Sequence, residues 1–242
     1  MKHTKIKSFT AACLAVLTAI GCASFSAYAE NEGFGGDHAI VDPDRYQEYL
    51  DSLTDEQRQL MEEKERMAAE IESALANRPY AAASNTYHDI PGIFTMYQQE
   101  TEWLCVPACI KSVLMYVNGS SPAQTTIDGV IRENFSNIPS YINDQQNRCF
   151  YIYLKNPTSN ELTSHIYSDV TRYKVPTFLR IVTRKPEWHY DTNGHCVLSN
   201  GISDDFLHIR IADPNGGLEP DFPYFYIGET SIVKEFTTTM CW

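Results

Sequence analysis

The side chains best suited to chemistry in this sequence are one cysteine, one histidine, one aspartate and one glutamine. Gln99 precedes Cys105 by six residues, and Gly194-His195 and Asp213-Pro214 follow much later. A reactive cysteine needs a base because the thiolate attacks carbonyl groups far better than the thiol, and a carboxylate can orient that base. A carboxamide can donate to an oxyanion. We therefore expect Cys105 to be the nucleophile, His195 the base, Asp213 the orienting acid and Gln99 an oxyanion donor.

The residues after Cys105 have the pattern of a buried helix. Apolar side chains recur at helical spacing as far as Val117, Asn118-Gly119 closes the segment, and Pro107 suits a first turn. The spacing therefore predicts that Cys105 lies at the positive end of a helix, where thiolates are stabilised. A cysteine on an apolar helix is also an ordinary core residue, so this pattern alone does not separate the two roles.

Two predicted strands would bring the histidine and the aspartate together. His195 begins an apolar, alternating segment over 194–202, and Asp213 ends a second one over 206–212. The turn Ser203-Asp204-Asp205 lies between them. A hairpin there would place Asp213 beside His195, where its carboxylate could accept a ring N–H. The alternative is that Asp213-Pro214 only opens a turn.

The remaining patterns divide the domain into an early helical part and a late strand-rich part. Further helices are predicted over 123–135, with Val130 facing inward, and over 159–173. Further strands are predicted over 175–182, 222–227 and 231–236. This order predicts an α+β fold over 85–242, in which an N-terminal helical half packs against a C-terminal antiparallel sheet.

The chain resembles the papain-like cysteine peptidases, and within them the branch similar to the double-glycine leader peptidases of bacteriocin exporters. The matching residues, which lie between about Tyr87 and Phe236, are Gln99, Trp103, Cys105, Pro107, Ala108, Gly194-His195, Gly201, Asp213-Pro214 and Gly216-Gly217. The resemblance implies a Cys-His-Asp site in the cleft between a helical and a sheet half, with peptides as substrates. Two residues depart from the pattern of this branch: Val106 stands where the branch often has Gly, and Leu104 separates Trp103 from Cys105. A bulkier residue beside the nucleophile would narrow the substrate groove, so these departures affect the expected substrate class more than the expected chemistry.

Two other functions use the same residues or the same fold. A transglutaminase-like acyltransferase would pass the acyl group from Cys105 to an amine, and a surface binding module would keep the fold without catalysis. Cys105, Cys109, His195 and Cys196 have side chains suited to zinc. Adjacent residues of a strand point to opposite faces, however, so His195 and Cys196 are poorly placed for one metal. We expect neither a metal nor another cofactor.

The start of the chain has the pattern of a secretory signal. Basic residues precede an apolar run from Phe9 to about Cys22, and Ser26-Ala27-Tyr28-Ala29 resembles a cleavage site. The run is short for a membrane span. We expect residues 1–29 to be removed and the protein to be secreted or held at the cell surface, with lipid attachment at Cys22 as the alternative.

The net charge of the chain limits its possible partners, and its cysteine count bears on disulfide bridges. A formal net charge of -12 argues against nucleic acid as a partner. Without the signal, five cysteines remain, and the odd number suggests one free thiol, for which Cys105 is the natural candidate. Cys109, Cys149, Cys196 and Cys241 would form bridges or remain buried thiols, and the pairing cannot be derived from their spacing.

An acidic helical extension precedes the domain, over residues 30–84. Asp42-Pro43 resembles a helix cap, and Thr54 with Gln57 forms a second one. A seven-residue apolar spacing continues as far as Ile71, but Gln57 and Lys64 interrupt it. The segment is either a solvated spacer or an intramolecular pro-segment that shields the active site. Gly35-Gly36 upstream resembles a cleavage site of the double-glycine peptidases.

Overall fold

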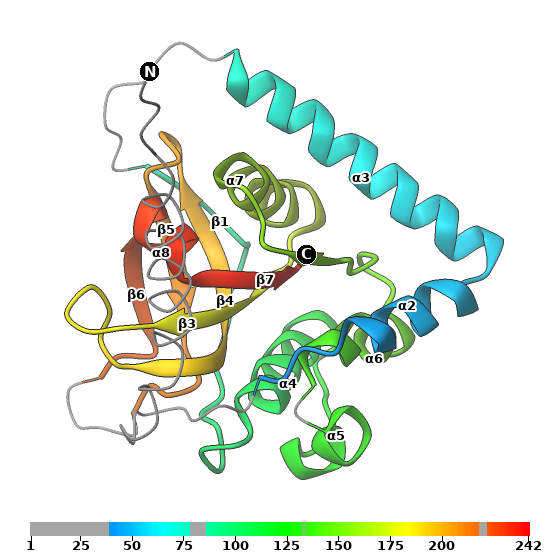
Figure 1. Cartoon of the computed structure of the whole chain (residues 1–242), viewed down its shortest axis with the longest axis horizontal. Coiled ribbons are helices and arrows are strands. Elements are labelled where there is room, and N and C mark those ends of the chain that lie inside the picture. Colours follow the sequence, from blue (N-terminus) through cyan, green and yellow to red (C-terminus); the bar gives the residue numbers. More distant parts are fainter. Residues whose placement is uncertain (1–38, 78–85, 133, 218–221) are drawn as a thin grey trace, which may run out of the picture. The chain divides into compact units, whose positions relative to one another are not determined.

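The computed structural model describes residues 39–77, 86–132, 134–217 and 222–242. The predicted signal peptide, Cys22 and Gly35-Gly36 lie outside these ranges, as do residues 78–84 at the end of the predicted extension. Within the described ranges, every helix is too short or too polar to cross a bilayer. The described residues belong to one compact unit, which contains both the extension and the predicted domain (Figure 1).

The extension forms two helices where the sequence predicts a helical segment. Helix α2 spans Pro43–Ser52, and the Asp42 side chain caps its N-terminus. Helix α3 spans Asp55–Ala76, and Thr54 and Gln57 form a complete capping box at its start. Both caps were predicted, because each places a side-chain acceptor directly before a run of good helix formers.

The helical half contains more short elements than the sequence predicts. The elements are α4 (Cys105–Asn118), α5 (Gln124–Ile131), the 3-10 helix η1 (Phe135–Asn137), α6 (Ile138–Gln145), α7 (Ser159–Ser168) and the π-helix η2 (Asp169–Tyr173). The prediction of one helix over 123–135 is wrong at its end, because Arg132 adopts a left-handed conformation with φ 50° and stops α5. Val130, which was expected to face inward, is 62% exposed.

The strands form one antiparallel sheet. They are β1 (Tyr87–Asp89), β2 (Tyr153–Lys155), β3 (Thr177–Thr183), β4 (Thr192–Ser203), β5 (His208–Ala212), β6 (Phe225–Glu229) and β7 (Thr237–Cys241). Within the described residues their order is β2-β7-β3-β4-β5-β6, and β1 also pairs with β4. The α+β class with a helical half against an antiparallel sheet is confirmed, and β4 and β5 form the predicted hairpin.

The prediction of a strand over 231–236 is wrong. This segment is helix α8, Thr230–Phe236, and the missed strand β7 follows it. Ile232 and Val233 favour strands as residue types, but Thr230, Val233 and Phe236 are the buried positions, and a spacing of three belongs to a helix. Strands β1 and β2 were also missed, since three residues are too few to show an alternating pattern.

Apolar side chains on the two faces of the sheet form two cores. One face packs on α4, α5 and α6 through residues such as Phe178, Cys196 and Leu198. The other face packs on α7 and α8 through residues such as Leu179 and Val197. Alternate residues of β4 therefore enter different cores, as the period of a strand requires. Helix α4, which carries Cys105, is held against the sheet by the first core.

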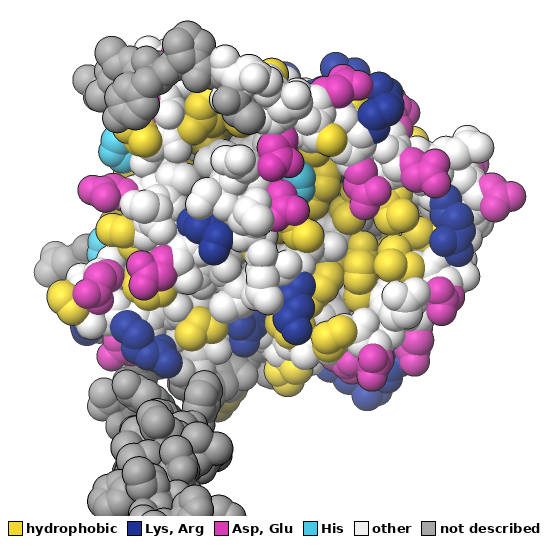
Figure 2. All heavy atoms as spheres, turned by 45° about the horizontal axis from the view of Figure 1, so that its top comes forward, with side chains coloured by type: hydrophobic (Ala, Val, Ile, Leu, Met, Phe, Trp, Pro, Cys, Tyr) yellow, Lys and Arg dark blue, Asp and Glu magenta, His cyan; other side chains and the backbone are white. Residues whose placement is uncertain are grey.

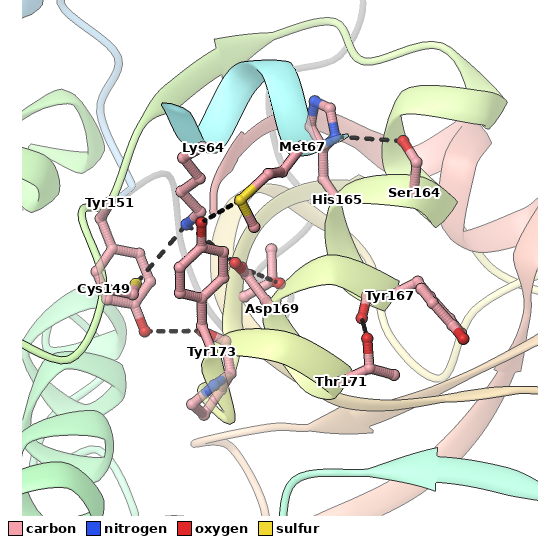
Figure 3. Close-up of polar contacts among 12 residues, drawn as sticks. Lys64, Met67, Cys149, Tyr151, Ser164, His165, Tyr167, Asp169, Thr171 and Tyr173 are labelled. Carbon is pink, nitrogen blue, oxygen red and sulfur yellow. Dashed lines mark hydrogen bonds and ion pairs between the residues drawn. The ribbon is translucent and has the colours of Figure 1, made fainter. Parts of the chain in front are cut away.

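A buried lysine fastens helix α3 to the rest of the unit. Figure 3 shows Lys64 pointing from α3 toward Cys149, Asp169 and Tyr173. Its ammonium lies 2.9 Å from Asp169 Oδ1 and within 5.3 Å of three aromatic rings, those of Tyr151, Tyr173 and Trp242. Burial alone lowers the pKa of Lys64, but the Asp169 charge outweighs burial and raises it. Lys64 therefore stays charged, and α3 is an integral part of the core.

The surface around this helix is mixed in character. On the face drawn in Figure 2, hydrophobic side chains gather in one patch among scattered acidic and basic ones. A groove of about 310 Å³ beside α3 is lined by apolar Leu60, Met67 and Phe150 and by charged Arg148 and Arg172. Leu60 is exposed although it belongs to the apolar spacing of the sequence, so that spacing does not mark a continuous buried stripe.

Candidate active site

Cys105 is the first residue of helix α4. Its side chain is 1% exposed and belongs to the core between this helix and the sheet. Leu104 precedes it without a side-chain cap, so the helix offers its own first-turn N–H groups toward the thiol. Pro107 has no backbone N–H, so the free N–H groups of the first turn before it are those of Cys105 and Val106. Such an N-terminus favours negative charge on the sulfur or on an oxygen beside it.

His195 and Asp213 meet as the predicted hairpin requires. His195 lies near the start of β4, Asp213 directly follows β5, and both side chains are fully buried. His195 Nε2 lies 2.9 Å from Asp213 Oδ1. The other ring nitrogen, Nδ1, has no hydrogen-bond partner within normal distance in the described structure. Cys105 is a neighbour of the imidazole, because its thiol contributes to the raised pKa of His195.

The environment strongly favours the imidazolium form of His195. Burial alone lowers its pKa, but the Asp213 charge and hydrogen bond outweigh burial, and the pKa rises from 6.5 to about 10. For Asp213, burial acts in the opposite direction, and the His195 charge and several hydrogen bonds lower its pKa. These opposite shifts favour a buried ion pair between the His195 imidazolium and the Asp213 carboxylate.

The Asp213 carboxylate receives hydrogen bonds at both of its oxygens. Oδ1 accepts from His195 Nε2 and from the backbone N–H of Asn215 at 2.9 Å each. Oδ2 accepts from the Tyr190 hydroxyl at 2.5 Å and from the Tyr226 hydroxyl at 2.8 Å. The sequence reasoning did not identify these two tyrosines. No local signal marks them, since tyrosine is common in and around strands.

Gln99 lies beside the Asp213 turn. Its backbone N–H donates to Pro214 O at 3.0 Å, which ties the segment before Cys105 to the residue after Asp213. The Gln99 side chain is 2% exposed, and neither its amide nitrogen nor its amide oxygen has a hydrogen-bond partner. A buried carboxamide without partners is costly, and a free amide donor is what an oxyanion site requires. The four predicted residues thus belong to one buried region.

A short segment of the extension contacts the strand that carries His195. We call residues 39–42 the strap. Ala39 N donates to Gly194 O at 3.4 Å, and Arg180 Nε donates to Ala39 O. On its other side the strap meets the helical half, where Phe135 N donates to Ile40 O at 2.7 Å and Asp42 N donates to Ser136 Oγ at 2.9 Å. The strap therefore spans from the sheet to the helical half next to His195.

The other four cysteines are buried free thiols, as is Cys105. Cys109 lies one turn after Cys105, and its thiol donates to Cys196 O at 3.3 Å. Cys196 enters the core on the α4 side, whereas the neighbouring residue His195 bonds Asp213. His195 and Cys196 thus point to different faces. Among the described residues, no group of three or more metal-binding side chains is arranged around a common point.

Comparisons with known proteins give little beyond these observations. A scan against protein-family models finds no match, and a search of curated proteins finds none either. Two chains of solved structures match. One is xylellain, a cysteine protease from Xylella fastidiosa, at 12% sequence identity and a TM-score of 0.43, covering 70% of this chain and 87% of that one. The protease activity is that of xylellain.

Proposed function

We propose that the protein is a secreted cysteine peptidase that hydrolyses peptide bonds through a thioester on Cys105. The observation that carries the proposal is the buried pair in which His195 binds Asp213 through Nε2 and leaves Nδ1 without a partner, with the Cys105 thiol as a neighbour of the ring. The unpartnered amide of Gln99 supports it, because a resting enzyme leaves its oxyanion donor free.

Each residue has a defined part in this reaction. The Cys105 sulfur attacks the carbonyl carbon as a thiolate while His195 is the imidazolium, and the resulting oxyanion accepts hydrogen bonds from the Gln99 amide and the Cys105 backbone N–H. His195 then gives its Nδ1 proton to the leaving amine, the C–N bond breaks, and a thioester remains. Water attacks the thioester and His195 accepts the water proton. The C–S bond then breaks, the acid product leaves, and the Cys105 thiolate and the His195 imidazolium are restored. Asp213 keeps the imidazole oriented throughout.

The extension is proposed to act as an intramolecular pro-segment at its strap. The strap pairs with Gly194, the residue before His195, while Cys105 and His195 are almost completely buried. A peptide substrate needs access to both, so a segment that joins the two halves beside them restricts entry. Helix α3, in contrast, contacts α7 and holds a buried ion pair with Asp169.

The decisive experiment compares the full chain without its signal with three variants: Cys105→Ala, His195→Ala and, as a matched control, Cys149→Ala. Cys149 is also a buried thiol, but it lies beside Lys64. Hydrolysis of casein is followed by mass spectrometry, and folding is checked by circular dichroism. We expect the first two variants to be folded and inactive, and Cys149→Ala to be active. Undiminished cleavage by Cys105→Ala would end the peptidase proposal.

The two rival functions give different results in the same assay. An acyltransferase would attach an added amine, such as putrescine, to the cleaved acyl group in preference to water. A binding module would cleave nothing, and its Cys105 would react with iodoacetamide at pH 6 no faster than Cys149. The peptidase proposal predicts hydrolysed peptides, little amine incorporation and faster alkylation of Cys105.

A further inference from the structure

The carboxylate of Asp213 has a second oxygen that plays no direct part in holding His195. Two phenols bind this oxygen, Tyr190 at 2.5 Å and Tyr226 at 2.8 Å. We propose that Tyr190 and Tyr226 are positioning residues that keep the shared proton of the buried pair on His195 and off Asp213. This inference rests on the proposed function, because an imidazolium that keeps its Nε2 proton gives its Nδ1 proton to the leaving amine more readily than a neutral imidazole does.

The proton of a buried histidine–aspartate pair has two possible positions. With the proton on nitrogen, the pair carries two opposite charges, and with the proton on oxygen, it is neutral. A fully buried site favours the neutral arrangement unless the charges receive hydrogen bonds. Oδ2 accepts from the two phenols in both arrangements, but hydrogen bonds to a carboxylate are stronger than those to the carbonyl oxygen of an acid, so the phenols favour the charged arrangement. The Tyr190 bond is one of the causes of the lowered pKa of Asp213.

The tyrosines are well suited to remain donors across the working pH range. Burial raises the pKa of both phenols well above the usual value, and the Asp213 charge raises it further. Neither hydroxyl therefore loses its proton before His195 does. Besides the tyrosines, His195 on β4 and the Cys109 thiol on α4 interact electrostatically with Asp213, and the Cys109 thiol donates its hydrogen bond to Cys196 O.

Packing fixes the direction from which each phenol approaches. Tyr190 comes from the segment before β4, and its ring meets the His195 ring edge to face at 5.6 Å and 87°. Tyr226 comes from β6 and packs edge to face against Trp188 at 5.8 Å and His189 at 4.6 Å. Because two separate elements hold the rings, the hydroxyls are positioned before substrate binds and need no rearrangement during the reaction.

The test measures the protonation state of His195 directly. The full chain without its signal is labelled with ¹⁵N-histidine, and the His195 ring signal is assigned as the one missing from His195→Gln. Midpoints of titration are then compared for the wild type, Tyr190→Phe, Tyr226→Phe and the double variant. Tyr151→Phe is the matched control, because Tyr151 is fully buried and donates to a neutral acceptor, Pro176 O, at 2.9 Å.

We expect the midpoint of His195 to fall by about one pH unit or more in each single variant and further in the double variant, since one unit is a tenfold change in the proton equilibrium. Tyr151→Phe should lose stability without moving the midpoint. An unchanged midpoint in folded Tyr226→Phe and Tyr190→Phe overturns the inference and leaves the peptidase proposal standing. A wild-type His195 that is already neutral at pH 7 overturns both. If the double variant does not fold, the two single variants decide.

Discussion

Replacing Asp213 by Asn tests how much of the reactivity depends on one buried charge. Asparagine has the same shape and its amide oxygen can still accept from His195 Nε2, so the substitution removes the charge, together with the oxygen that accepts from Tyr190 and Tyr226. The pKa of His195 is raised from 6.5 to about 10, mainly by Asp213 acting against burial. Without that carboxylate, burial is the main remaining cause, and we expect the pKa to fall below 6.5.

The expected loss can be calculated from these values. At pH 8, a group with a pKa near 10 is ~99% protonated, whereas one with a pKa of 6.5 is ~3% protonated, so the imidazolium population falls at least ~30-fold. The rate of Cys105 alkylation by iodoacetamide at pH 6 to 9 and the rate of peptide hydrolysis should both fall by a factor of this order. Profiles of Asp213→Asn and wild type that coincide would refute the assignment of the ion pair.

The same charge pair predicts a pH dependence of folding stability. A pKa that is higher in the folded state than in the unfolded state stabilises the protein fully below the unfolded value, and the contribution disappears as pH rises through the folded value. For His195 that window runs from 6.5 to about 10. Urea midpoints of the wild type should therefore fall across this range, and those of Asp213→Asn should change much less.

Three further changes test other parts of the structure. Gln99→Ala should lower kcat/KM for peptides about a hundredfold, roughly 3 kcal/mol of barrier, while leaving Cys105 alkylation unchanged; equal activity would remove Gln99 from the oxyanion site. Lys64→Met should lower the free energy of unfolding by about 3 kcal/mol or more, because it leaves Asp169 as an unpaired buried charge. Adding Asp169→Asn to this variant should restore part of the lost stability. If urea titrations show no recovery in the double variant, the ion pair is contradicted. Ala39→Glu would put a charge at a fully buried strap position and should speed Cys105 alkylation in the full chain severalfold, whereas a slower reaction would show that the strap does not restrict access.

The parts of the site that could be predicted depend on residues that are close together in the sequence. A helix start before an apolar run placed Cys105, and a turn between two alternating segments placed Asp213 beside His195. Each step needs only neighbours along the chain and the period of a helix or strand. For the same reason the two caps of the extension were found.

The parts that could not be predicted depend on contacts between distant segments. Tyr226 reaches Asp213 only because β6 pairs with β5 in the register that sets Tyr226 opposite Ile211. Lys64 was interpreted as an interruption of an apolar stripe, since lysine is rarely buried. In the structure it is the most deeply buried cation of α3, because Asp169, 105 residues later, supplies the opposite charge.

These contacts divide the extension into two parts with different relations to the site. Removing α3 would expose Asp169 and three aromatic rings that now surround Lys64, so the folded unit depends on this helix. The strap is held less firmly than α3, because its described contacts are a few hydrogen bonds to Gly194, Arg180, Phe135 and Ser136, the buried methyl group of Ala39, and the partly buried Val41 side chain against the first core. Backbone hydrogen bonds of this kind are replaced by water at small net cost. Under the proposed pro-segment role, cleavage of the chain is therefore expected to free the strap while α3 stays in place, and the proposed peptidase should retain the α3 helix after activation.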